Sequence, residues 1–195
     1  MNLEQLEKNL QVINPKSGLT PLYFNRNQCY LFEFIQKENF TLVLKSRQQG
    51  ISTLLSILAI AEAHDNRKNI LFFTKNPELV KDLIKINPRF NRQTERYTRD
   101  QIEFKGGGKI DFRTRVKNNA CGRKEDYIIV DESIDFTTLD DLRICYGPTV
   151  WPNGKIIVQH TFFEDTGYGS TPYIIRHPVP QVIRDLEFQV CDLCW

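Results

Sequence analysis

Apolar residues along the chain gather in short runs that alternate with segments of helical spacing. The runs at residues 41–44 and 69–73 predict two strands, and residues 52–64, rich in Leu, Ile and Ala, predict a buried helix between them. A second helix is expected to begin near Pro77 and to end at residue 87. This alternation predicts an α/β fold with a mostly parallel sheet and helices on both faces.

Three later segments extend the predicted sheet. Residues 101–104 and 109–112 flank a run of three glycines, which is typical of a β-hairpin. Residues 126–130 are almost continuously apolar and end in two acids, as expected of a central parallel strand. Residues 155–158 predict one more strand.

The two ends of the chain carry weaker patterns. Residues 1–20 are polar and predict a lead-in with one short helix, followed by a helix over residues 25–38. Beyond residue 166 the Gly, Pro and Tyr content predicts irregular structure, and a short helix is expected from residue 181 onward.

Length and composition indicate one globular domain. The 195 residues contain 41% hydrophobic and 26% charged residues, and we expect residues 21–165 to form the core and residues 166–195 a C-terminal extension. No apolar run reaches the roughly 20 residues of a membrane span, and the first residues do not resemble a signal peptide, so we expect no membrane partner. Five cysteines without regular spacing favour a reducing compartment. Cys191-x-x-Cys194 is either incidental or half of a metal site completed outside the chain.

The charge is unevenly distributed. The net charge is only +2, but residues 89–124 hold eleven Lys or Arg against four acids, a local +7. Such a segment suits a phosphate-rich partner or an anionic subunit interface, and a solvated charged face is the alternative.

The stretch LVLKSRQQGISTLL, residues 42–55, has the outline of a phosphate-binding loop between a strand and a helix. In the common pattern G-x-x-x-x-G-K-[ST], the lysine reaches the terminal phosphates and the hydroxyl binds Mg²⁺. Here Lys45 occupies the first glycine position and Ile51 the lysine position. Gly50 and the following helix N-terminus still offer N–H groups to an anion, and the cation would be Lys45 or Arg47. A surface turn with two solvated cations is the alternative.

An acidic pair follows the strand at residues 126–130. In YIIVDES, Asp131 is suited to hold Mg²⁺ together with Ser52, while Glu132 could orient or deprotonate an attacking water. An apolar strand that happens to end in two solvated acids is the alternative reading.

Together, KSRQQGIST and IIVDES resemble the ATPase domain of the large terminase subunit, the DNA-packaging motor of tailed bacteriophages and related viruses. Many members of that family place a basic residue at the start of the loop and an arginine-glutamine pair before its glycine. The resemblance covers about residues 20–165 and implies a P-loop NTPase fold of the additional-strand type. It implies a nucleotide-binding loop made of Lys45, Ser46, Arg47, Gln48, Gln49, Gly50, Ile51, Ser52 and Thr53.

Three further positions follow from the same resemblance. Gln28, in PLYFNRNQCYLFEFI, stands where the family reads adenine, and Thr161, in KIIVQHT, stands where a hydroxyl couples γ-phosphate loss to movement. The family often has an arginine followed by glycine that reaches a neighbouring subunit's nucleotide. Here Cys121 precedes Gly122, so the candidate trans-acting arginine is Arg123.

The resemblance implies Mg²⁺-dependent ATP hydrolysis that powers translocation of double-stranded DNA into a viral capsid. The expected partners are double-stranded DNA, further copies forming a homo-oligomeric ring on a capsid portal, and a separate nuclease or small terminase subunit. No nuclease domain is recognised in residues 1–195, and the expected location is the cytoplasm of the infected host cell. A helicase-like or remodelling ATPase, a nucleotide-binding assembly protein without turnover, and a small-molecule kinase remain alternatives.

Overall fold

The computed structural model describes residues 3–14, 16–45, 48–114, 125–131, 150–161 and 189–193. The helices are α1 (Leu3–Asn9), α2 (Arg26–Lys37), α3 (Ile51–Asp65), α4 (Glu78–Ile86) and α5 (Pro88–Asn91). The strands are β1 (Gln11–Asn14), β2 (Gly18–Pro21), β3 (Phe40–Lys45), β4 (Asn69–Phe73), β5 (Thr94–Tyr97), β6 (Gln101–Phe104), β7 (Lys109–Arg113), β8 (Glu125–Val130), β9 (Val150–Thr161) and β10 (Gln189–Leu193).

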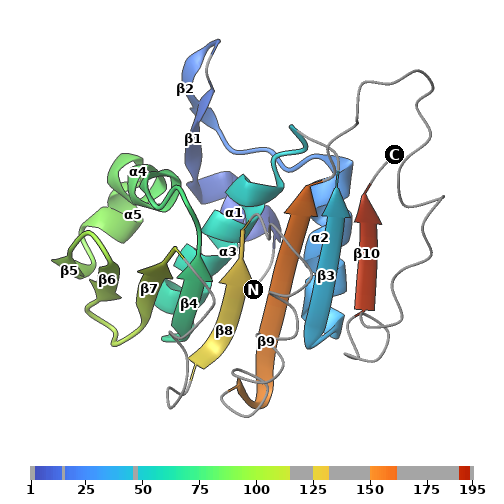
Figure 1. Cartoon of the computed structure of the whole chain (residues 1–195). Helices are drawn as coiled ribbons and strands as arrows, with labels where there is room; N and C mark the ends of the chain where they lie inside the picture. The colour runs from blue at the N-terminus through green and yellow to red at the C-terminus, as the bar shows by residue number, and fades with distance from the viewer. Residues whose placement is uncertain are drawn as a thin grey trace.

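Eight of these strands form one sheet in the order β10-β3-β9-β8-β4-β7-β6-β5 (Figure 1). The strands from β10 to β7 are parallel, and β6 and β5 continue the sheet with antiparallel pairs. The predicted α/β fold with a mostly parallel sheet is therefore confirmed. Strand β9 lies between β3 and β8, which is the arrangement expected of the additional-strand type.

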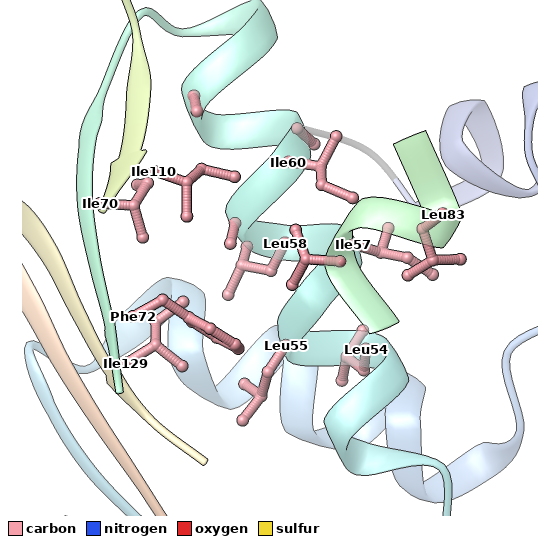
Figure 2. Packing of buried hydrophobic residues seen from close by; sticks show 14 of the residues in the cluster. Leu54, Leu55, Ile57, Leu58, Ile60, Ile70, Phe72, Leu83, Ile110 and Ile129 are labelled. Carbon is pink, nitrogen blue, oxygen red and sulfur yellow. The ribbon is translucent and has the colours of Figure 1, made fainter. Parts of the chain in front are cut away.

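Helix α3 forms the centre of the core because it is apolar on nearly all sides. In Figure 2, Leu55 and Leu58 face Phe72 of β4 and Ile129 of β8, while Ile57 lies close to Leu83 of α4. The helix is thus packed between the sheet and α4, and its first turn is fixed at one edge of the sheet. Among the described helices, none is long and apolar enough to cross a membrane.

Two regions differ from the expectation at the chain ends. Residues 189–193, expected within a short helix that begins at residue 181, form the edge strand β10, which pairs in parallel with β3. Residues 181–188 lie outside the described part. Near the N-terminus, the expected short helix is α1. A hairpin that was not expected follows it, in which β1 pairs with β2. Gly18, the first residue of β2, has φ 76°.

Candidate functional site

The site lies at the carboxyl edge of the parallel strands, the upper edge in Figure 1, where β3, β9 and β8 end side by side. Lys45 ends β3 and is in Cα register with Thr161, which ends β9. Asp131 follows β8, and its backbone N–H donates to the Phe73 carbonyl at the end of β4 (2.8 Å). The sheet therefore brings together Lys45, Thr161 and Asp131 from segments far apart in the sequence.

The loop before α3 has an unusual backbone. Gln48 has φ 64°, and Gly50, the N-cap of α3, has φ 71° and ψ 16°. Both are left-handed, a conformation that glycine adopts without steric cost. Among the described residues, no side chain caps the N-terminus of α3, so its first-turn N–H groups and the positive end of the helix dipole face the loop, where they favour an anion.

Ser52 and Asp131 meet beside this loop. The Ser52 Oγ donates a hydrogen bond to Asp131 Oδ1 (2.9 Å), although the two residues come from α3 and from the end of β8. Gln159 of β9 donates from Nε2 to the same carboxylate oxygen (2.8 Å). The fold thus brings the loop hydroxyl and the carboxylate at the strand end within hydrogen-bonding distance, and their shared role in binding Mg²⁺ stays a prediction.

The chemistry of this cluster fits Mg²⁺. A hydroxyl oxygen and a carboxylate oxygen are hard ligands, and Mg²⁺ is commonly held by one or two carboxylates together with water and substrate phosphates. Metal–oxygen bonds of about 2.0–2.1 Å at right angles place neighbouring ligand oxygens about 2.9 Å apart, which equals the observed Ser52–Asp131 separation. Among the atoms that the structure describes, Gln159 Oε1 is buried and without a hydrogen-bond partner.

Sequence patterns did not assign a role to Gln159. Its side chain is fully buried near the end of β9, directly after the apolar run Ile156–Val158, and lies between Ser52 and Asp131. A buried polar group is costly unless it is hydrogen-bonded. The signal in the sequence is a glutamine placed directly after the apolar run IIV of a strand.

Lys45 and Ile51, which occupies the lysine position of the common pattern, have different surroundings in the structure. Lys45, at the end of β3, is buried with 6% of its surface exposed. Ile51 is completely buried and belongs to the hydrophobic core. Its side chain therefore belongs to the core, and Ile51 can offer only its backbone N–H to a group bound at the loop.

Gln28 has a structural role that was not expected. Its Oε1 accepts from the Asn25 backbone N–H (2.9 Å), while the Asn25 side chain accepts from the Gln28 N–H, a capping box at the start of α2. Its Nε2 donates to the carbonyl oxygen of Gly50 (2.8 Å). Asn25 and Asn27 also donate to the backbone and side-chain oxygens of Gln49. The start of α2 thus supports the phosphate loop, and adenine recognition by Gln28 stays a prediction.

Several site predictions fall outside the described residues. These are Ser46, Arg47, Glu132, Arg123 and the side chain of Thr161. Thr53 is half-buried in the first turn of α3. Cys191 lies on β10 next to Val43, whereas Cys194 is not described. Of the basic segment 89–124, residues 89–114 are described and form α5 and β5 to β7.

Comparison with known proteins shows similarity at the level of the fold. No protein-family model matches the sequence, and no curated protein sequence matches it. The structure is similar to the crystal structure of the large terminase of bacteriophage HK97, with a TM-score of 0.64 and 12% identity over 97% of this chain and 42% of that one. It is also similar to a mutant of the large terminase ATPase domain of Thermus phage P74-26, with a TM-score of 0.52 and 16% identity over 89% of this chain and 81% of that one. The chain thus has the P-loop NTPase fold and spans about two-fifths of the HK97 protein.

Proposed function

We propose that this chain is the ATPase domain of a viral DNA-packaging motor, in which Mg²⁺-dependent ATP hydrolysis drives double-stranded DNA into a capsid. The observation that carries the proposal is the 2.9 Å contact between Ser52 and Asp131, beside a left-handed glycine and an uncapped helix N-terminus. The fold similarity to two phage large terminases supports the packaging role. Residues 21–165 would form the ATPase core.

Each site residue has a role in this proposal. The N–H groups of Gly50 to Thr53 would bind phosphate oxygens, and Lys45 or Arg47 would supply the cation near the terminal phosphates. Ser52 and Asp131 would hold Mg²⁺, which neutralises charge on the phosphates during transfer. Gln159 keeps the Asp131 carboxylate turned toward Ser52 through its 2.8 Å hydrogen bond.

The remaining steps concern water and movement. Glu132, next to Asp131, would accept a proton from the attacking water or hold it in line. Thr161 lies in register with Lys45 and would sense loss of the γ-phosphate through β9. Arg123 would complete a neighbour's site in a homo-oligomeric ring on a capsid portal. Such a motor would work in the cytoplasm of an infected host cell, with a small terminase subunit or a nuclease as partner.

A magnesium titration of ATP hydrolysis tests the site. Ser52→Ala and Asp131→Asn should each raise the Mg²⁺ concentration for half-maximal hydrolysis at least about tenfold, the lower end of what loss of residues supporting a metal site costs. Ser56→Ala is the matched control, because this buried serine lies one turn further along α3 and donates to the Ser52 carbonyl (2.7 Å).

Two results would contradict the proposal. One is a parent protein that binds ATP and Mg²⁺ without hydrolysing ATP, which would favour an assembly protein without turnover. The other is an unchanged magnesium requirement in both site variants, which would separate Ser52 and Asp131 from the metal.

A further inference from the structure

A second polar site lies at the far end of α3. The helix begins at the phosphate loop and has 15 residues, so its C-terminus is about 20 Å from the loop at 1.5 Å per residue. There the structure has a pocket of about 840 Å³ between the end of α3, the helix α5 and the turn after β6. Its charged lining residues are Asp65, Arg67, Arg89 and Arg92, with His64 beside them.

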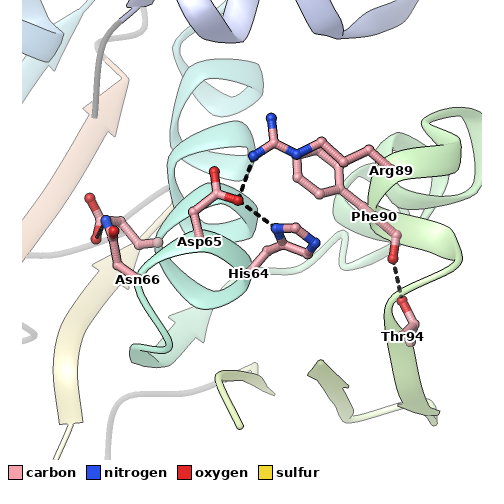
Figure 3. Close-up of polar contacts among 7 residues, drawn as sticks. His64, Asp65, Asn66, Arg89, Phe90 and Thr94 are labelled. Carbon is pink, nitrogen blue, oxygen red and sulfur yellow. Dashed lines mark hydrogen bonds and ion pairs between the residues drawn. The ribbon is translucent and has the colours of Figure 1, made fainter. Parts of the chain in front are cut away.

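One of the three arginines is already held in place. The Asp65 carboxylate contacts both the Arg89 Nη2 (2.7 Å) and the His64 Nδ1 (2.5 Å), as Figure 3 shows. The His64 ring is in turn fixed edge-on between Phe90 and Phe104, with centroid distances of 5.1 and 5.4 Å. Arg89 therefore has a defined position at the rim, and its side chain is 43% exposed.

The other two arginines have no such partner. Arg67 and Arg92 are exposed, and neither side chain has a hydrogen bond or an ion pair with the residues that the structure describes. Arg67 also has φ 56°, a backbone conformation that is uncommon outside glycine. Three guanidinium groups thus line the pocket against one carboxylate. The negative end of the α3 dipole, equivalent to about half a charge, does not cancel this excess.

The lining indicates which anion would bind. Guanidinium groups match the oxygens of phosphate in a two-pronged geometry. Small-molecule pockets are usually mostly apolar and enclose their ligand, whereas the charged groups here are exposed. One further basic residue is close in the chain: the exposed Lys105 follows β6, and its backbone N–H donates to the carbonyl of the pocket residue Gln93 (2.8 Å). An open and basic surface of this kind suits the phosphates of a nucleic-acid backbone, which are themselves exposed to solvent.

We propose that this pocket, lined by Arg67, Arg89 and Arg92, binds the phosphodiester backbone of double-stranded DNA, apart from the nucleotide site. The choice of DNA as partner rests on the proposed function, whereas the affinity for phosphate rests on the pocket itself. The contacts are to the backbone, so the binding is independent of base sequence.

Fluorescence anisotropy with a labelled DNA duplex over a range of salt concentrations tests this proposal. In Arg67→Ala/Arg92→Ala the slope of log affinity against log salt should fall by about two units, one for each lost phosphate contact, and equally for two unrelated sequences. Lys37→Ala/Lys16→Ala is the matched control, since both lysines are exposed and lie outside the pocket lining. Parent-like slope and affinity in the pocket variant would overturn the proposal. Calorimetry with tripolyphosphate gives a second such outcome. If the pocket variant loses tripolyphosphate binding but keeps the DNA binding of the parent, the pocket binds phosphate but not DNA, and the proposal is overturned.

ATP hydrolysis without DNA, measured in the same variants, keeps this test distinct from that of the proposed function. Parent-like hydrolysis with a reduced salt slope supports both proposals. Parent-like hydrolysis with an unchanged salt slope refutes only the proposal of DNA binding at the pocket. A parent protein that does not hydrolyse ATP, but whose salt slope depends on the pocket arginines, refutes only the proposed ATPase function.

Discussion

Gln28 offers a sharp test, because adenine recognition and support of the phosphate loop predict different results for the same substitution. Gln28→Leu keeps the approximate size and removes both polar atoms. It eliminates the bond from the Asn25 N–H to Oε1 (2.9 Å) and the bond from Nε2 to the Gly50 carbonyl (2.8 Å). Each such hydrogen bond contributes about 0.5–1.5 kcal/mol, so we expect a loss of about 2 kcal/mol in the free energy of unfolding.

The same loss should reach nucleotide binding through Gly50. If nucleotide binding must restore the loop conformation that Gln28 supports in the parent, the full 2 kcal/mol lost in Gln28→Leu corresponds to about a 30-fold weaker nucleotide affinity. The affinity should fall equally for ATP and GTP, because the lost contacts involve the loop and not the base. Urea unfolding and nucleotide titrations measure the two effects, with Gln36→Leu as the control on an exposed position of α2. A selective loss of ATP affinity, with the stability and GTP affinity of the parent, would refute loop support and favour adenine recognition.

Three further predictions concern the cation, the packing and the response to alkaline pH. Lys45→Ala should weaken ATP binding and slow hydrolysis, each about 10- to 100-fold, because a charged hydrogen bond contributes about 1.5–3 kcal/mol; parent-like single-turnover rates would contradict this. Gly108→Ala should destabilise the fold by about 2 kcal/mol or more in thermal unfolding, because its Cβ would lie 1.9 Å from the Ala63 carbonyl oxygen. Gly106→Ala, whose Cβ has only ordinary contacts, is the control. Tyr97 is 40% exposed, but partial burial of its hydroxyl, followed by the nearby charges of Glu78 and Asp82, raises its pKa from 10.0 to about 12. Its contribution to the free energy of unfolding is therefore complete below pH 10 and is lost as pH rises toward about 12. Tyr97→Phe should therefore flatten the fall in stability measured by urea unfolding over that range, and an unchanged fall would contradict the assignment.

The central elements were predictable because their signal is local. The strands and helix around residues 41–73 are apolar runs bounded by turns, and the structure places β3, α3 and β4 there. By contrast, β10 is a strand only because it pairs with β3, and the paired residues Gln189 and Thr41 are far apart in sequence. The hairpin β1–β2 is mostly exposed, so no alternation of apolar and polar residues marks it.

The close approach of Ser52 and Asp131 could be predicted for a topological reason. The carboxyl ends of parallel strands share one edge of the sheet, and the helix after the loop begins at that edge, so Ser52 and Asp131 had to approach each other. The orientation of side chains at this edge could not be predicted in the same way. The contact between Gln159 and Asp131, for example, depends on which side chains of β9 point toward Asp131. The N-x-x-Q spacing of Asn25 and Gln28 is typical of a capping box, whereas the resemblance implies adenine recognition by Gln28.

Under the proposed function, the apolar residue at position 51 and the lysine at position 45 have a common physical cause. Ile51, Leu55 and Leu58 follow helical spacing and are all almost completely buried, so position 51 belongs to the core-facing side of α3. An ammonium group in this position would lose its hydration without gaining a partner, at a cost of several kcal/mol. The end of β3 reaches the same edge of the sheet, since Lys45 is in register with Thr161. Under the proposed function, a cation carried by the strand lets the first turn of α3 pack into the core while its N–H groups remain directed at phosphate.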